Sequence, residues 1–467
     1  MSDARERFDA IIIGVGQAAS ALANRLAGAG MTVAVIERRA VGGTCVNVGC
    51  TPTKSMVASA SVARLAARAA EYGVAIPGTP TVDMAAVHER TSAIVAKSRT
   101  GLERWLGGLP GVTLIRGHAR FESARTVRAD DRLIEADKVF INVGGRASAA
   151  NIEGLDEVPW LSSSDMVALR ELPRHLVVIG GSYIGLEFAQ MFRRFGAQVT
   201  VVERGARLMP REDAEVSDEI RAILEAEGVV FKLDAECIRV RPHPEGVAVI
   251  THGGKEETIG SHVLVAAGRV PNTDDLGLDK AGVRTGPHGH IEVDERLATN
   301  VPGIWALGDC NGRGAFTHTA YNDYEIVAAN LLDGEPRSVN DRIPVYGLYI
   351  DPPLGRVGMT EEQALAQGRT VRVGKRPMTR VGRAVEKGER QGSMRIVADA
   401  RTDEILGAAI LGPGGDEAVH MVLAAMAAKM TARQLTHVVA IHPTVSELIP
   451  TIAGELGDAV APPARAG

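Results

Sequence analysis

The chain has 467 residues, of which 45% are hydrophobic and 23% are charged, and its net charge is −5. This composition excludes a disordered or collagen-like chain, and at roughly 150 residues per domain the length predicts about three domains. No apolar run approaches the roughly 18 residues that span a membrane, no Lys/Arg block indicates nucleic acid, and the charged N-terminus is unlike a signal peptide. We therefore expect a cytoplasmic protein that binds neither membranes nor nucleic acid.

The first predicted unit is a strand, a glycine-rich turn, a helix and a second strand. The expected elements are a strand at 10–13, a helix at 20–29 and a strand at 32–36. Gly14, Gly16 and Ala19 fill the G-x-G-x-x-G/A pattern, and Glu37 ends the second strand. The first glycine permits a tight turn, and the second lets a pyrophosphate approach the helix N-terminus. The carboxylate can accept hydrogen bonds from ribose hydroxyls, so the unit predicts a dinucleotide site.

The same unit recurs 166 residues further along the chain. Gly180, Ser182 and Gly185 repeat the turn, and Glu203 stands where Glu37 stands in the first unit. The expected elements are a strand at 176–179, a helix at 183–195 and a strand at 198–202. Ser182 departs from the glycine pattern and adds a small side chain near the phosphates. Two matching units favour two bound dinucleotides over two merely structural turns, and we interpret them as a flavin and a nicotinamide.

Two further apolar runs, 140–145 and 263–268, are predicted to be the last strands of the two units. After about residue 340 the pattern changes to short strands punctuated by prolines, followed by an Ala/Met-rich helix at 416–430. We predict that this helix belongs to a core or a subunit interface. The fold class expected is α/β, with two Rossmann-like dinucleotide-binding domains and an α+β C-terminal domain.

Two of the four cysteines, Cys45 and Cys50, follow the first unit directly. In a regular helix, residues five apart have Cα atoms roughly 8 to 9 Å apart. A disulfide needs less than about 7 Å, so a bridge requires a distorted turn, which Gly49 and Pro52 could provide. A strained bridge is easily reduced, and a helix N-terminus lowers the pKa of a thiolate. Half of a zinc site is the alternative, but we favour a redox disulfide.

The other two cysteines have no comparable surroundings. Cys237 lies in a strand-like segment, Cys310 follows Gly308 and Asp309, and we expect both to be small buried residues. No second pair of ligands accompanies Cys45 and Cys50, so we predict no resident metal.

The segment GGTCVNVGC followed by TPTK, at 42–54, resembles the redox signature of the pyridine nucleotide–disulfide oxidoreductases. This family includes glutathione reductase, lipoamide dehydrogenase and mercuric reductase. AGRVPN at 267–272, WALGD at 305–309 and HPTVSE at 442–447 resemble other motifs of the family, so the resemblance covers nearly the whole chain. It is strongest to mercuric-reductase-like flavoproteins and reactive-chlorine-resistance copper reductases.

The resemblance implies both a domain plan and an activity. It implies an FAD-binding domain at 1–150 and 270–338, an NAD(P)-binding domain at 151–269 and a dimerisation domain at 339–467. The activity implied is an FAD-dependent NAD(P)H oxidoreductase that reduces a small disulfide, an oxidant or a metal ion. Reducing equivalents would pass through FAD to a Cys45–Cys50 bridge.

The resemblance also implies roles for individual residues. Cys50 would be the charge-transfer thiol against the flavin, and Cys45 would attack the substrate. Lys54 would pair with Glu187 beside the flavin.

His442 would be the acid/base, oriented by Glu447 and supplied by the partner subunit, so the enzyme would be a homodimer. FAD contacts are expected from Gly14, Gly16, Ala19, Glu37, Gly43, Thr44, Lys54, Ala119, Gly144, Asp309 and Thr317. Contacts to NAD(P) are expected from Gly180, Ser182, Tyr183, Ile184, Gly185, Glu203 and Gly268.

Glu203 favours NADH as the coenzyme, because its carboxylate would repel the 2′-phosphate of NADPH. Arg204 and Arg207 follow at once and could bind a phosphate, so we expect NADPH to be accepted as well.

The chain also departs from individual subfamilies. Mercuric reductases proper and large thioredoxin reductases carry a C-terminal cysteine pair, whereas the last cysteine here is Cys310. The substrate-binding Arg of glutathione reductase falls at Asn24. A dihydrolipoamide dehydrogenase subunit of a 2-oxoacid dehydrogenase-type complex is the alternative, although Ala440 and Ile441 stand where those enzymes usually carry a second His. A flavin fold kept only as a binding module is a third reading, and the intact cysteine pair argues against it.

Overall fold

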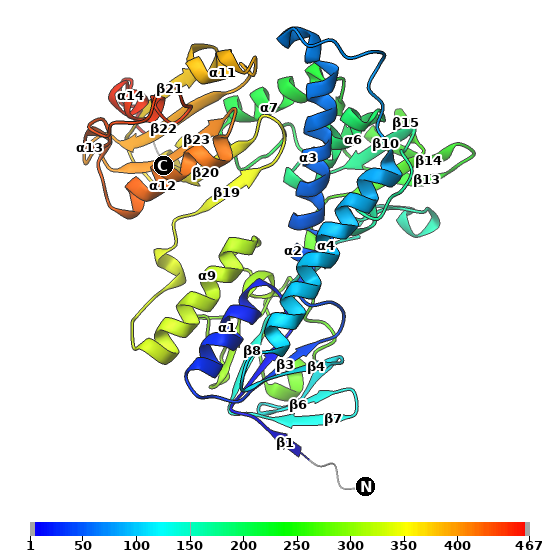
Figure 1. The fold of residues 1–467 in the computed structure, drawn as a ribbon, viewed down its shortest axis with the longest axis vertical. Coiled ribbons are helices and arrows are strands. Elements are labelled where there is room, and N and C mark those ends of the chain that lie inside the picture. The colour runs from blue at the N-terminus through cyan, green and yellow to red at the C-terminus, as the bar shows by residue number, and fades with distance from the viewer. Residues whose placement is uncertain (1–4, 150, 463–467) are drawn as a thin grey trace.

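The computed structural model describes residues 5–149 and 151–462, which form three sheet-based domains (Figure 1). The first dinucleotide unit lies at the bottom of Figure 1, the second at the upper right and the C-terminal domain at the upper left. The predicted fold class is confirmed, since both units contain parallel sheets and the C-terminal domain contains an antiparallel one. No helix within the described ranges is long and apolar enough to cross a membrane.

The first unit is a five-stranded parallel sheet in the order β18-β8-β2-β3-β4. Its strands are β2 (Ala10–Ile13), β3 (Val33–Glu37), β4 (Val112–Arg116), β8 (Lys138–Ile141) and β18 (Ile304–Ala306). Every residue of β2 is buried, because alternate side chains enter cores on opposite faces of the sheet. Helices α1 (Gln17–Gly28) and α9 (Thr317–Ala328) cover one face.

A four-stranded sheet, β1-β7-β6-β5, covers the other face of the first unit. Its strands are β1 (Arg5–Arg7), β5 (Ala119–Ser123), β6 (Thr126–Ala129) and β7 (Arg132–Glu135). A short antiparallel pair, β9 (Gly145–Ala147) with β17 (Arg269–Pro271), joins the two units. Between them run α2 (Gly43–Val48) and the long helices α3 (Cys50–Ala67) and α4 (Met84–Gly107), which rise through the centre of Figure 1.

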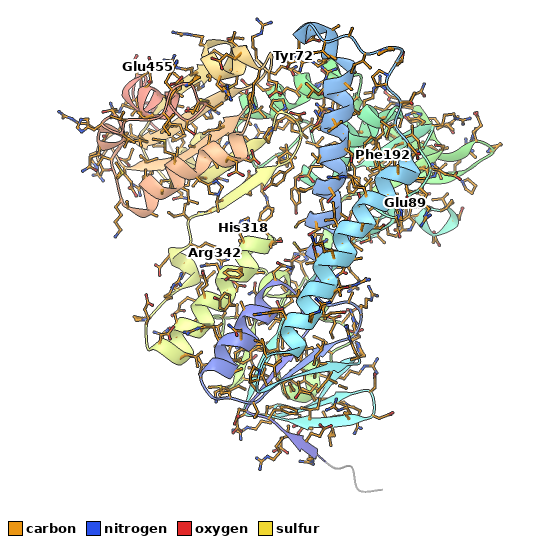
Figure 2. All side chains as sticks on the ribbon, viewed as in Figure 1. Tyr72, Glu89, Phe192, His318, Arg342 and Glu455 are labelled. Carbon is orange, nitrogen blue, oxygen red and sulfur yellow. The ribbon has the colours of Figure 1, made fainter. Side chains whose placement is uncertain are left out.

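The second unit repeats the strand–turn–helix–strand plan. Its parallel sheet, β12-β11-β10-β16, contains β10 (His175–Ile179), β11 (Gln198–Val202), β12 (Val230–Lys232) and β16 (His262–Val265). Helix α6 (Tyr183–Phe195) has the predicted bounds, and its Phe192, labelled in Figure 2, is buried against this sheet with α7 (Ala214–Ala226). The other face is covered by β13 (Arg239–His243), β14 (Gly246–Thr251) and β15 (Glu256–Gly260).

The C-terminal domain is a five-stranded antiparallel sheet, β19-β20-β23-β22-β21, with helices on it. Its strands are β19 (Val345–Leu348), β20 (Leu354–Gly358), β21 (Val371–Pro377), β22 (Ser393–Asp399) and β23 (Ile405–Leu411). The predicted Ala/Met-rich helix is α12 (Gly415–Ala427), which packs on the sheet through Val419, Val422 and Ala425. The shorter helices are α10 (Glu361–Ala366), α11 (Gly382–Glu386), α13 (Ala432–Leu435) and α14 (Leu448–Gly454), with α5 (Ser163–Met166) and α8 (Leu278–Ala281) in the first two domains.

Three sequence-based expectations differ from the structure. The strands expected at 140–145 and 263–268 end at Ile141 and Val265, and the chain then turns toward glycines with positive φ at 144 and 268. Helix α1 begins at Gln17 rather than at residue 20, because it starts directly after the turn. Cys237 is neither buried nor in a strand: it is exposed, with φ of 52°, in a bend between β12 and β13.

Candidate active site

The first glycine-rich turn lies so close to neighbouring backbone that residues larger than glycine would not fit there. Gly14 has φ of 89°, and a Cβ there would lie 2.6 Å from the carbonyl oxygen of Asn142. A Cβ on Gly43 would lie 3.0 Å from the Cα of Gly16. Because α1 starts directly after Gly16, its first amides are free to bind a pyrophosphate there.

Glu37 fastens the end of β3 to this turn. Its Oε2 accepts a hydrogen bond from the Val15 amide at 2.8 Å, and its Oε1 accepts one from the Arg39 amide at 2.7 Å. The carboxylate that the sequence assigned to a ribose therefore also orders the backbone around it.

A cavity of about 660 Å³ opens beside the turn, which is within the usual range for cofactor pockets. All but one of the predicted FAD residues line it: Gly14, Gly16, Glu37, Gly43, Thr44, Lys54, Ala119, Gly144, Asp309 and Thr317. The exception is Ala19, which is buried inside α1 and packs the helix against the sheet. The glycine-walled turn, the free helix N-terminus and the size of the cavity fit a flavin dinucleotide.

The helix that carries the cysteine pair is broken between the two residues. Helix α2 ends at Val48 and α3 begins at Cys50, while Gly49 between them has φ of −126° and ψ of −117°. A Cβ on Gly49 would lie 2.9 Å from the carbonyl oxygen of Thr44, so a larger residue would not fit. This break is the distorted turn that a bridge between Cys45 and Cys50 requires. Both cysteines are free here, and the side chain of each shifts the pKa of the other.

In the reduced pair, the pKa values of the two cysteines shift in opposite directions. The hydrogen bond from Cys45 lowers the pKa of Cys50 to about 6 against the cost of burial, with further help from Thr317 and Lys54. The Thr317 Oγ1 lies 3.2 Å from the Cys50 Sγ, and the position of Cys50 at the start of α3 also favours a thiolate. The same hydrogen bond, together with burial, raises the pKa of Cys45. These opposite shifts favour the thiolate on Cys50 and the thiol on Cys45.

The predicted ion pair between Lys54 and Glu187 is present. The Lys54 Nζ lies 2.7 Å from Glu187 Oε2, and the Glu187 side chain is only 4% exposed. Lys54 is on α3 and Glu187 is on α6, so the pair joins the two dinucleotide units at the wall of the cavity.

The second turn repeats the close backbone approach of the first. Gly180 has φ of 121°, and a Cβ there would lie 2.7 Å from the carbonyl oxygen of Ala266. A Cβ on Gly185 would lie 2.0 Å from the carbonyl oxygen of Gly180. Helix α6 starts directly after Ser182, whose hydroxyl donates to Met209 Sδ at 3.8 Å.

Glu203 repeats the role of Glu37. Its Oε2 accepts from the Gly181 amide at 2.6 Å, and its Oε1 accepts from the Gly205 amide at 2.7 Å. Arg207 is engaged elsewhere, in a two-fold contact with Glu362 of α10 at 3.1 and 3.0 Å. The sequence suggested two arginines that could bind a phosphate. Arg207 is held by an ion pair with the third domain, whereas Arg204 is exposed.

The predicted NAD(P) residues fall into two groups. Tyr183 and Ile184 line the flavin-sized cavity. The others lie outside its lining: Gly180, Ser182, Gly185, Glu203 and Gly268. The first turn of α6 therefore borders both the second glycine-rich turn and the cavity.

Asp309 also lines the cavity, in the short turn before α9. Burial raises the pKa of its carboxyl, and Arg269 opposes this rise from 3.4 Å. The neighbouring Cys310 is buried as expected, and burial raises its pKa to about 12.

His442 and Glu447 form the expected pair, with Nδ1 2.8 Å from Oε2. His442 is 80% exposed and does not line the cavity of its own chain. The preceding loop is equally exposed, with Val439 at 96% and Ile441 at 79%.

Several residues that line the cavity were missed by the sequence analysis: Asn142, Arg269, Phe316, His318 and Tyr349. Phe316 stacks on His318 and Tyr346, with ring centroids 5.3 and 5.8 Å apart. His318, labelled in Figure 2 at the end of α9 nearest the C-terminal domain, contacts the carbonyl oxygen of Val345 at 2.8 Å. Asn142 and Phe316 lie in loops, His318 lies on α9, Arg269 on β17 and Tyr349 in the third domain. Of these residues, only Arg269 falls within a motif that the sequence analysis singled out, AGRVPN at 267–272. Across 5–149 and 151–462, no group of three or more His, Cys, Asp or Glu side chains could hold a metal ion.

Comparison with known proteins places this architecture in one family. The family model "Pyridine nucleotide-disulphide oxidoreductase" matches residues 8–323, and the family's dimerisation-domain model matches residues 345–453. The Escherichia coli (strain K12) protein named "Probable pyridine nucleotide-disulfide oxidoreductase RclA" is 35% identical over 94% of this chain and 97% of its own length. The mitochondrial dihydrolipoyl dehydrogenase of Pisum sativum is 34% identical over 94% of this chain and 90% of its own length.

A solved structure gives the same result. The Cu(II) complex of the HOCl-induced flavoprotein disulfide reductase RclA from Escherichia coli superposes with a TM-score of 0.88 at 33% identity, covering 96% of this chain and 99% of that one. The family implies FAD and a pyridine nucleotide as cofactors, and the turns and the cavity described above fit both. The chain therefore belongs to the pyridine nucleotide–disulphide oxidoreductase family and is a flavoprotein disulfide reductase.

Proposed function

We propose that this enzyme uses a Cys45–Cys50 redox disulfide, FAD and NAD(P)H to reduce a small disulfide, an oxidant or a metal ion. One observation carries the proposal: the Cys50 thiolate and the Lys54–Glu187 pair share the wall of a flavin-sized cavity between two dinucleotide turns. Bound FAD would relay two electrons from the nicotinamide to the disulfide. Residues 1–150 and 270–338 would hold FAD, 151–269 the nicotinamide nucleotide, and 339–467 the dimer contact.

Different residues of the chain would act on the two cysteines of the reduced pair. The Cys50 thiolate is stabilised by Thr317 and Lys54, so it keeps its charge toward the cavity. Cys45 is a thiol, so it must lose its proton to a base before it attacks a substrate. Glu447 holds the His442 imidazole by its Nδ1, which leaves Nε2 free to take that proton.

The position of His442 supports a shared site in a homodimer. Within its own chain it lies outside the cavity lining, on an exposed apolar loop suited to contact a second copy. We propose that it completes the site of the partner subunit. Mixing inactive Cys45→Ser and His442→Ala protomers should restore activity to as much as a quarter of the wild-type sites. No recovery after demonstrated subunit exchange would contradict a shared site.

We propose NADH as the preferred coenzyme, with NADPH also accepted. Glu203 is fixed at the turn by two amides, and Arg207 is held by Glu362. Both features disfavour a 2′-phosphate, while the exposed Arg204 leaves one cation for it.

The substrate is tested by steady-state assays with glutathione disulfide, lipoamide, Hg(II), Cu(II) and hypochlorite-type oxidants. We propose Cu(II) as the first to try, because the similar RclA structure is described as a Cu(II) complex. Turnover of none of these substrates by the yellow, FAD-loaded enzyme would contradict the proposed function. Turnover that is lost in both Cys45→Ser and Cys50→Ser would support it.

The second candidate is a dihydrolipoamide dehydrogenase subunit of a larger complex. It is favoured by the 34% identity to the pea enzyme. Oxidation of dihydrolipoamide faster than any of the substrates above, together with binding to an acyltransferase core, would establish it.

A further inference from the structure

Tyr349 contacts both members of the Lys54–Glu187 pair from the third domain. The Lys54 Nζ lies 4.5 Å from the centroid of the Tyr349 ring. The Tyr349 amide donates a hydrogen bond to Glu187 Oε1 at 3.0 Å, which leaves Oε2 to Lys54 at 2.7 Å. The ring thus fixes the cation, and the backbone of the same residue fixes its counter-ion.

The segment that carries Tyr349 is rigidly attached to α6. Gln190 makes two hydrogen bonds of 2.8 Å with the backbone of Asp351, and Arg194 contacts the Asp351 carboxylate at 2.6 Å. The ring packs on Gly347, where a Cβ would lie 3.3 Å from two ring carbons. Glu187, Gln190 and Arg194 lie on the same face of α6, so these contacts fix the position of Tyr349 relative to Glu187.

Lys54 needs this support because its own side chain is flexible. Its side chain is 35% exposed, and a four-carbon stem can carry the ammonium into water. An aromatic face within about 6 Å attracts an ammonium by its quadrupole, and a fixed carboxylate sets the direction. A cation held beside a flavin favours the more negative, reduced state of that flavin.

We propose that Tyr349 is a positioning residue, whose ring holds the Lys54 ammonium against Glu187 and thereby raises the midpoint potential of the bound flavin. The inference rests on the proposed function, because it requires a flavin in the cavity beside Lys54. Tyr349 itself transfers no electron and no proton in this role.

The test is the flavin midpoint potential of the purified holoenzyme, measured against a reference dye. Tyr349→Phe keeps the aromatic face and should leave the potential unchanged. Tyr349→Leu removes the face and should lower it, with an about threefold change in the reduction equilibrium, or about 14 mV at 29.6 mV per factor of ten. Equal potentials for the Phe and Leu variants would overturn the proposal. Tyr349 is 37% exposed, so we expect both variants to fold, as flavin content and melting temperature will show.

Two further measurements separate the ring's electrostatics from its shape. Phenylalanines with increasing fluorination at position 349 keep the shape while weakening the quadrupole, so the potential should fall stepwise. In a Lys54→Met background, Tyr349→Phe and Tyr349→Leu should have the same potential. A difference that persists without Lys54, or a flat fluorination series, would overturn the inference. A protein that binds no flavin would instead contradict the proposed function, and this inference would fail with it.

Discussion

The two glycine-rich turns share one device but differ in their surroundings. In each, a glutamate at the end of the second strand binds one amide of the turn and one amide just beyond itself. The first turn is closed by Asn142 and Gly43 and opens into the cavity with the cysteine pair. The second is closed by Leu208 and Met209 and opens outside it. Local sequence thus makes a dinucleotide turn, and neighbouring segments decide what chemistry lies next to it.

The largest expected effect comes from the cysteines that only the first turn has nearby. Cys45→Ser and Cys50→Ser should each lower kcat for disulfide reduction at least about a thousandfold, because each removes one half of the redox pair. Cys45→Ser should retain long-wavelength absorbance from the Cys50 thiolate beside the flavin, and Cys50→Ser should lose it. Cys237→Ser is the matched control, since Cys237 is exposed outside the cavity, and its activity should be unchanged. Full activity in both active-site variants would refute the redox pair.

Substitutions at the third position of the two glycine motifs, Ala19 and Gly185, should lower the free energy of unfolding by different amounts. Gly185→Ala places a Cβ 2.0 Å from the Gly180 carbonyl oxygen, so we expect it to lower the free energy of unfolding by about 1–3 kcal/mol. Ala19→Gly adds no clash and should cost about 0.5–1 kcal/mol through helix entropy. Urea unfolding followed by tryptophan and flavin fluorescence measures both changes. Equal losses would show that the turns are packed alike.

Removing Glu37 or Glu203 should weaken the binding of one cofactor and not of the other. Glu203→Ala should lower kcat/KM for NADH roughly tenfold, through the loss of hydrogen bonds to a charged group, while FAD content stays unchanged. Glu37→Ala should lower FAD content and leave the NADH to NADPH ratio of kcat/KM unchanged. If Glu203→Ala discriminates between the coenzymes as the wild type does, Glu203 does not select NADH.

The smallest expected effect is a pH shift at Cys50. In the reduced enzyme, alkylation of Cys50 by iodoacetamide should have a midpoint at about pH 6, because its pKa is lowered to about 6. Thr317→Val should move the midpoint upward by roughly half a unit to one unit, and Thr317→Ser should not. Because the folded pKa lies below the ordinary 9.0, the stability from this thiolate is complete above about pH 9 and is lost as pH falls through about 6. An unchanged midpoint in Thr317→Val would show that Thr317 does not lower the pKa of Cys50.

Much of the fold could be read from the sequence because it depends on short segments. The run at 10–13 is apolar at every position, as a strand buried on both faces must be, and the helix at 183–195 begins and ends at its predicted residues. Cys237 was misplaced because its segment was interpreted as a strand, whereas the structure places it, with a φ of 52°, in the loop between β12 and β13.

The sequence by itself determined the two strand–turn–helix–strand units and the glutamate at the end of each, since these follow from local backbone sterics over a few residues. The break of the helix at Gly49 and the amides that each glutamate binds were found only in the structure. Only the tertiary structure decided which distant groups meet there. Thr317 lies 267 positions from Cys50, and its hydroxyl still helps to make Cys50 the thiolate. Tyr349 reaches the Lys54–Glu187 pair from a third domain. Such contacts depend on how packed domains are oriented, and no periodicity or spacing along one segment records that orientation.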